Sequence, residues 1–179
     1  MDVTKITSQQ IEALIAKHGL NLNQEGVVLV GIRQKPGLNK VGVWDDAFAW
    51  AHKGSIRAFA GNTDPSREFP HVANLKPGAW KYQKGIHHGL SGAFPPYPAY
   101  IQAGDVTVLR YIDGHNWNPD TGEFGIHIHH GGTGTSSLGC QTVPIANWPD
   151  FKAHGDALIL QYNKKEFTYL LVENDGEFV

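Results

Sequence analysis

The stretch FGIHIHHGGTGTSSLGCQTVP, residues 124–144, combines three histidines, a run of glycines and the only cysteine of the chain. Residues 124–129 alternate in character and predict a strand. In this strand Ile126 and Ile128 face a core, while His127 and His129 share the opposite face. His130 begins a glycine-rich loop. The ten residues 130–139 are enough for the chain to reverse and to bring the Cys140 thiol back beside the imidazole.

Short strands are also predicted on both sides of this stretch. They lie at residues 27–32, 44–50, 55–60, 80–82, 99–102 and 106–111, with turns at 35–39, 62–65 and 76–78. Residues 157–161 and 167–172 alternate around a short polar turn and predict a C-terminal hairpin. Residues 113–122 (DGHNWNPDTG) predict a polar loop. The predicted fold is therefore mainly β, in a single domain that spans residues 1–179.

Two helices accompany the predicted strands. Residues 6–18 predict an N-terminal helix, because Thr7 and Gln10 have the spacing of a capping box and Gly19 is placed to end it. Residues 145–154 predict one short helix after the cysteine, with Pro149 limiting its start.

The composition excludes several classes of partner. A net charge of −2 over 179 residues gives no basic bias, so we expect no nucleic-acid partner. No apolar run approaches the roughly 20 residues that span a bilayer, so we expect no membrane partner. The start MDVTKITSQQ has neither a basic region nor an apolar region of a secretory signal. We therefore expect a cytoplasmic protein, with delivery to the periplasm by another route left open.

A thiol beside an imidazole is the arrangement that cysteine nucleophiles need. A free thiol has a pKa of about 8.5, so a nearby histidine must take its proton and later return it to the leaving group. We choose His129 as the base, with His127 as the second candidate. The N–H groups around Gly139 and Cys140 are candidates for an oxyanion hole, and a backbone carbonyl can orient the histidine. The alternative roles are a buried apolar cysteine and a solvent-facing polar strand edge.

The motif S-L-G-C, preceded by F-G-I-H-x-H, resembles the catalytic domain of L,D-transpeptidases of the YkuD type. The signature of that family is a histidine–glycine strand end, a glycine-containing loop and S-x-G-C. Residues 59–65 and 77–82 resemble the family more loosely. The resemblance implies that Cys140 is the nucleophile, that a histidine of 127–130 is the base, and that no cofactor is needed. It also implies an L,D-transpeptidase-like β-sandwich with an N-terminal helix and one short helix after the cysteine.

The sequence departs from the family at two points. The gap between histidine and cysteine is shorter than usual, as in a branch with effector-like members. The family has arginine two residues after the cysteine, where this chain has Thr142. Arg110, Lys81 or the His87–His88 pair are the candidates to replace it. The predicted substrate contacts are Ser137, Gln141, Thr142, His87, His88, Arg110 and Tyr97, the last from an aromatic loop at residues 85–100.

By this resemblance, the expected function is that of an L,D-carboxypeptidase that removes the terminal D-alanine from peptidoglycan tetrapeptides during muropeptide recycling. The partners are then stem peptides or soluble muropeptides. The alternatives within the family are an L,D-transpeptidase that forms 3–3 cross-links or exchanges D-amino acids, and a delivered effector that acts on the cell wall. Two alternatives belong to other classes. One is a zinc-dependent cell-wall peptidase that uses the His127–His129 pair with His87, His88 or His115, and the other is a non-catalytic glycan-binding module.

Overall fold

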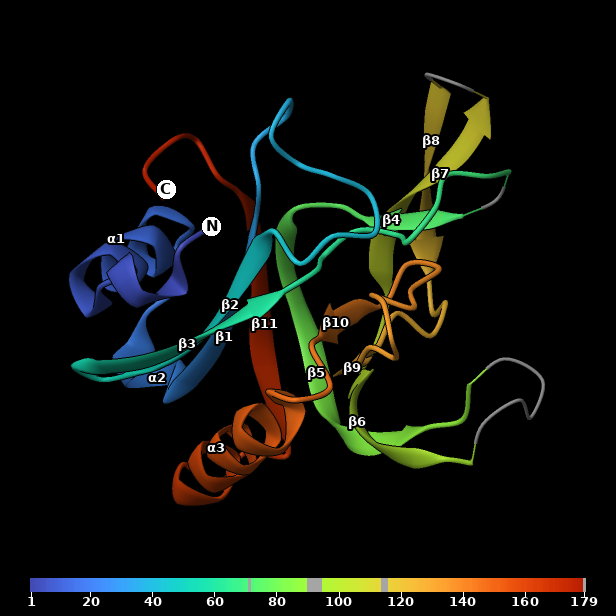
Figure 1. The fold of residues 1–179 in the computed structure, drawn as a ribbon. Coiled ribbons are helices and arrows are strands. Elements are labelled where there is room, and N and C mark those ends of the chain that lie inside the picture. The colour runs from blue at the N-terminus through green and yellow to red at the C-terminus, as the bar shows by residue number, and fades with distance from the viewer. Residues whose placement is uncertain (71, 90–94, 114–115, 179) are drawn as a thin grey trace.

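The computed structural model describes residues 1–70, 72–89, 95–113 and 116–178, and its fold is mainly β (Figure 1). The strands are β1 (Val27–Arg33), β2 (Asp46–His52), β3 (Ser55–Gly61), β4 (Ala73–Leu75), β5 (Gly78–His87), β6 (Tyr97–Gln102), β7 (Val106–Asp113), β8 (Asn116–Gly122), β9 (Ile128–His130), β10 (Gln141–Val143) and β11 (Glu166–Glu173). The helices are η1 (Val3–Lys5), α1 (Ser8–Lys17), α2 (Leu22–Glu25) and α3 (Trp148–Gln161). This confirms the mainly β class.

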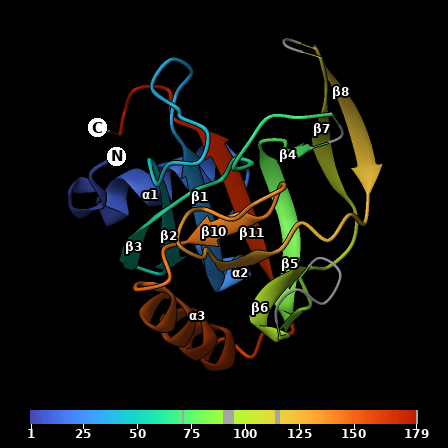
Figure 2. The ribbon, with the colours of Figure 1, turned by 45° about the vertical axis from the view of Figure 1, so that its right-hand side comes forward.

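Eight strands form one mixed sheet in the order β10-β9-β6-β5-β11-β1-β2-β3. Asn62, which directly follows β3, pairs with Thr142 of β10 through two backbone hydrogen bonds of 2.8 Å. The two edges of the sheet therefore meet beside the predicted nucleophile. A second sheet of β4, β7 and β8 stands at one side, and the β7–β8 pair extends away from the large sheet (Figures 1 and 2).

The central strands are buried on both faces, as β1 illustrates. Val27 and Leu29 point into a core cluster that α3 covers with Phe151, Leu158 and Ile159. Val28, Val30 and Ile32 point into a second cluster, which α1 covers with Ile11, Leu14 and Ile15. A strand between two apolar layers has a continuous apolar run rather than an alternating one. The N-terminal helix and the capping box of Thr7 and Gln10 are confirmed.

The predicted C-terminal hairpin is wrong, because residues 157–161 belong to α3 rather than to a strand. The predicted short helix at 145–154 is its first part. Pro149 lies in the first turn, where a proline removes no helical hydrogen bond. The buried positions Trp148, Phe151, Gly155, Leu158 and Ile159 follow the period of a helix. β11 pairs instead with β1 and β5.

Two further segments differ from the prediction. Residues 113–122 were predicted as a polar loop, but Asn116–Gly122 is strand β8, which pairs with β7 from Val106↔Gly122 onward. Pairing with a neighbour outweighs the weak strand propensity of these residues. The predicted strand 124–129 is largely irregular, and only Ile128–His130 forms β9. In residues 124–127, the backbone N–H groups of Phe124 and Ile126 donate to the amide oxygen of the Gln102 side chain.

Gly155 allows α3 to approach the sheet closely. A Cβ atom there would lie 2.3 Å from a ring carbon of Trp50 and 2.5 Å from the Tyr100 hydroxyl. We expect Gly155→Ala to lower the free energy of unfolding by about 1–3 kcal/mol, because overpacking outweighs the better helix propensity of alanine. Urea unfolding measures this change. In the control Ala157→Gly, on the exposed face of α3, propensity alone predicts a loss of about 1 kcal/mol. A more stable Gly155→Ala protein would contradict this account of the packing.

Candidate active site

The cysteine returns to the histidines through parallel pairing of β9 with β10. His129 lies opposite Thr142 in the register, and the Gln141 N–H donates to the His127 carbonyl over 2.8 Å. The residue before this pair is Cys140, so its side chain emerges beside the start of β9. The His127 N–H donates to the Cys140 Sγ at 3.4 Å, and the thiol faces the Gly125 carbonyl at 3.5 Å. The predicted chain reversal is therefore confirmed.

Two imidazole rings lie close to the thiol. The Sγ of Cys140, a ring nitrogen of His129 and a ring nitrogen of His87 all lie within 4.8 Å of one another. His87 ends β5, and its ring stacks on that of His129 with centroids 4.3 Å apart. Its Nδ1 also lies 3.0 Å from the Nδ1 of His127. The sequence predicted His87 as a substrate contact or a third zinc ligand, but not that its ring contacts both His127 and His129.

The hydrogen bonds of His129 determine its tautomer. Its Nδ1 lies 2.6 Å from the His130 carbonyl oxygen, which can only accept. The proton of the neutral ring must therefore sit on Nδ1, and the Tyr97 hydroxyl, 3.0 Å away, then accepts from the same N–H. This leaves Nε2 with a free lone pair and without a hydrogen-bond partner among the described residues. A base oriented by a backbone carbonyl is the arrangement that the thiol chemistry requires.

Burial keeps this group of side chains neutral at rest. Burial, reinforced by His87, lowers the pKa of His129 to about 3. Burial, with His87 and His88 nearby, lowers the pKa of His127 to about 4. Burial raises the pKa of the Cys140 thiol to about 11, although the His127 N–H opposes this shift. The resting pair is thus a thiol and an uncharged imidazole, and the proton must move as the sulfur attacks.

These shifts predict how the thiol reacts with iodoacetamide. Because the pKa of Cys140 is raised to about 11, the thiolate fraction at pH 7 is about one in 10⁴ and increases about tenfold per pH unit. We expect the alkylation rate to rise without a plateau between pH 6 and pH 9.5. Intact-protein mass spectrometry follows the single adduct, since the chain has one cysteine. The urea-unfolded chain is the control and should level off near pH 9. A pH-independent rate from pH 5 to pH 8 in the folded protein would instead indicate a thiolate–imidazolium pair.

The Ser137 hydroxyl and Gly139 stabilise the loop that leads to Cys140. Ser137 Oγ donates to the Cys140 carbonyl at 2.6 Å and accepts from the Gly139 N–H at 2.9 Å. A Cβ at Gly139 would meet the Ala73 carbonyl at 2.6 Å, so this glycine is needed for packing against β4. Since the Gly139 N–H is already bound, the Cys140 N–H remains as the oxyanion donor of this pair. It has no acceptor among the described residues.

Gln141 and Thr142 lie in the interior. Gln141 Oε1 accepts from the Tyr169 hydroxyl at 2.8 Å, and its Nε2 donates to the carbonyls of Gly139 and Thr63. Thr142 is completely buried where the two sheet edges meet. The position of the family's arginine is therefore inside the protein here, and neither side chain is placed to contact a substrate.

The cations proposed as replacements are engaged or peripheral. Arg110 forms an ion pair with Asp120 at 3.1 Å and lies over the ring of Phe124. Lys81 donates to Thr168 at 2.7 Å and lies 3.6 Å from Glu25, on the β5–β11 pair. His88 is exposed and follows His87 directly. Tyr97, in contrast, lies at the site, since it contacts His129 and stacks on His130 with centroids 4.2 Å apart.

The side chains that converge as metal ligands within the described residues are His87, His129 and Cys140, not the predicted His127–His129 pair. His115 lies outside the described residues. Imidazole and thiolate suit zinc. However, the rings of His87 and His129 are only 17° from parallel, so their lone pairs do not converge on one point. One ring must turn before both nitrogens can bind the same ion.

Comparisons with protein-family models, with curated proteins and with solved structures find no match to this chain. Among the described residues, the helices are too short or too polar to cross a membrane.

Proposed function

We propose that this protein is a cysteine-dependent acyl-transfer enzyme of the L,D-transpeptidase type. In this proposal it acts as an L,D-carboxypeptidase that removes the terminal D-alanine from peptidoglycan tetrapeptides. The observation that supports the proposal best is the position of His129, which has a ring nitrogen within 4.8 Å of the Cys140 Sγ and its Nδ1 at 2.6 Å from the His130 carbonyl oxygen. A nucleophile, a base with a free Nε2 and a fixed acceptor for its Nδ1–H are the parts that thiol acyl transfer needs. The substrate class and the L,D-transpeptidase-like β-sandwich come from the resemblance of the motif.

Each proton in the proposed reaction has a defined carrier. The Cys140 sulfur bonds to the carbonyl carbon of the third residue of the stem peptide while His129 Nε2 takes the thiol proton. The developing oxyanion lies by the Cys140 N–H. The C–N bond to D-alanine then breaks, and the imidazolium returns the proton to the leaving amine. Water next adds to the thioester as His129 takes one of its protons. The thioester breaks, His129 returns its proton to the sulfur, and the tripeptide leaves as a carboxylic acid that releases its proton to solvent.

Resolution of the same thioester by an amine is the alternative within this class. An amino group of a second stem peptide would give a 3–3 cross-link, and a free D-amino acid would give exchange. A delivered effector would use the same site on wall substrates. The first half of the reaction is shared by all these forms, so the geometry at Cys140 supports each of them.

The convergence of His87, His129 and Cys140 favours one candidate of another class, a zinc-dependent peptidase. In that case the cysteine would be a ligand and not a nucleophile. A non-catalytic glycan-binding module is the remaining alternative, in which the site would bind substrate without turning it over.

The test is mass spectrometry of a disaccharide-tetrapeptide incubated with the wild-type protein, with and without a chelator. The expected result is loss of one D-alanine at the same rate in both samples, with a transient acyl-protein adduct. Dimers or exchanged D-amino acids in the same spectra would establish the transpeptidase instead. Cleavage that stops with the chelator and returns with Zn²⁺ would establish the zinc enzyme. No turnover by a folded protein that binds the substrate would indicate the binding module.

A further inference from the structure

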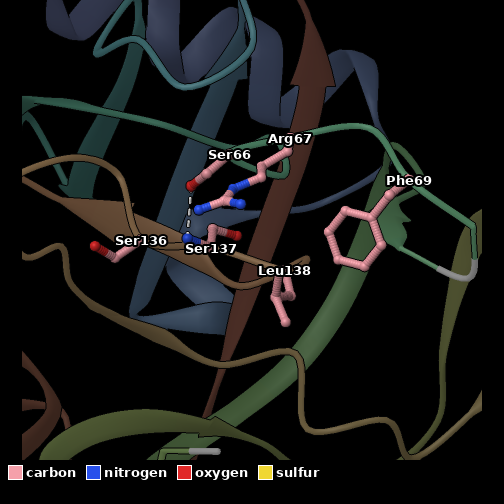
Figure 3. Close-up of a pocket in the computed structure, with 6 residues that line it drawn as sticks. All are labelled: Ser66, Arg67, Phe69, Ser136, Ser137 and Leu138. Carbon is pink, nitrogen blue, oxygen red and sulfur yellow. Dashed lines mark hydrogen bonds between the residues drawn. The ribbon is translucent and has the colours of Figure 1, made fainter.

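A small pocket is lined on one side by residues 136–138 of the loop that leads to Cys140. It has a volume of about 210 Å³ and is lined by Ser66, Arg67, Phe69, Ser136, Ser137 and Leu138. Figure 3 shows its two sides, with Arg67 and the serines on one and the ring of Phe69 and the side chain of Leu138 on the other. Whole small-molecule ligands occupy roughly 300–1,000 Å³. This pocket therefore suits one end of a ligand, with a polar group and a small apolar group side by side.

Arg67 provides the charge of the pocket. The other three arginines of the chain have carboxylate partners, since Arg33 pairs with Asp64, Arg57 with Asp150 and Arg110 with Asp120. Within the described residues, no carboxylate forms an ion pair with Arg67 and no hydrogen bond involves its guanidinium. An arginine fork matches a carboxylate in shape and charge. The pocket thus presents an unneutralised cation to whatever enters it.

The apolar side of the pocket is open to a ligand as well. Phe69 is 39% exposed and Leu138 is 44% exposed, which places them among the most exposed large apolar side chains of the described residues. A methyl group between them would remove part of both surfaces from water. In chemistry, the pocket therefore matches a carboxylate with a small apolar substituent next to it.

The pocket is rigidly connected to the nucleophile. Ser66 Oγ accepts from the Ser137 N–H at 2.6 Å (Figure 3). The Ser66 N–H also donates to the Ser137 carbonyl at 2.8 Å. Ser137 in turn binds the Cys140 carbonyl. Arg67 and Leu138 are the direct neighbours of Ser66 and Ser137 in the chain. A ligand group held in this pocket consequently has a fixed position relative to the loop that carries the thiol.

We infer that this pocket is the subsite for the leaving residue of the substrate, with Arg67 binding its terminal carboxylate and Phe69 and Leu138 flanking its methyl group. This inference rests on the proposed function, in which the leaving residue is D-alanine. D-Alanine carries a carboxylate and a methyl group on one carbon atom, which is the combination that the two sides of the pocket accept. Arg67 then determines specificity for peptides that end in a free carboxylate.

The experiment uses Cys140→Ala protein, which retains the pocket but cannot turn over substrate. Calorimetric titration compares L-Ala-γ-D-Glu-diaminopimelate-D-Ala with the same peptide carrying a C-terminal carboxamide. We expect the free acid to bind about tenfold more tightly than the amide. In the double variant Cys140→Ala/Arg67→Gln, the free acid should bind more weakly while the amide binds as before, so the preference should disappear. Arg57→Gln is the matched control, because Arg57 is exposed and paired with Asp150, and it should keep the preference.

Two kinds of failure can be distinguished. Equal binding of acid and amide by Cys140→Ala protein, or an acid preference that survives Arg67→Gln, would overturn the inference. Weaker binding of the amide after Arg67→Gln would also overturn it, because Arg67 would then bind an acidic group inside the peptide. None of these results affects cleavage of the tetrapeptide by the wild-type enzyme. Conversely, an Arg67-dependent acid preference in a wild-type protein that cleaves nothing would overturn the proposed reaction and retain the pocket as a carboxylate site.

Discussion

Replacement of Cys140 by alanine is expected to lower kcat for D-alanine release by between about 10⁴-fold and 10⁶-fold, to the level of the uncatalysed background. The sulfur forms the covalent bond in the proposed reaction, and the described site has no second nucleophile to take its place. Binding should persist, because the pocket of Arg67, Phe69 and Leu138 does not use the thiol. The measurement is D-alanine release from tetrapeptide, followed by mass spectrometry, with Kd from calorimetry.

Cys140→Ser is the matched control for this substitution. A hydroxyl keeps nearly the size of the thiol and its contact with the His127 N–H, but it is a much weaker nucleophile at neutral pH. We expect it to be nearly as inactive as the alanine variant and equally stable. Residual activity within tenfold of wild type in Cys140→Ala protein would show that the cysteine does not attack. If that activity were also lost with a chelator, a catalytic metal ion would be bound without the thiol, with His87 and His129 as its candidate ligands.

Removal of the imidazole in His129→Ala is expected to lower kcat/KM at pH 7 by about 10³–10⁴-fold, the upper part of the range for general bases. The reason is the raised pKa of the Cys140 thiol. Since burial raises the pKa of Cys140 to about 11, almost no thiolate exists at pH 7 without a base to take the proton. Without His129, the rate should follow the thiolate fraction and rise about tenfold per pH unit up to pH 9. The measurement is a pH profile of kcat/KM.

Above pH 5, kcat/KM of the wild-type protein should change much less with pH than that of His129→Ala. The pKa of His129 is lowered to about 3, so its Nε2 is unprotonated throughout this range and can accept the thiol proton. An acid limb near pH 6.5 in the wild-type profile would contradict the buried, neutral base.

His127→Ala is the control that separates the two histidines. Its backbone N–H, which contacts the sulfur, remains in place, and its ring contacts His87. We expect a loss of less than about tenfold. If His127→Ala were the inactive variant and His129→Ala retained activity, the assignment of the base would be wrong.

Local patterns predicted the buried strand β1 and the capped helix α1. The apolar run of β1 and the capping box of α1 depend on residues close in sequence, and both are confirmed. α3 and β8 were mispredicted for opposite reasons. In α3, a proline and a glycine that normally interrupt helices are tolerated by position and by packing against Trp50. In β8, a polar segment becomes a strand only because β7 supplies the hydrogen-bond partners.

The sequence by itself predicted that a histidine of 127–130 and Cys140 meet, with His129 as the first choice, since the histidines, a glycine-rich reversal and a motif ending in cysteine lie within 21 residues. Only the tertiary structure decided the environment of that pair. It brought His87 from β5 and Tyr97 from β6 against the imidazole and assigned its proton to Nδ1. It also buried Gln141 and Thr142 and placed Arg67 in one pocket with Ser137 and Leu138. The physical reason is the distance along the sequence between the residues that interact. Reversal of the chain depends on local backbone freedom, whereas burial, tautomer and charge pairing depend on strands that are distant in sequence.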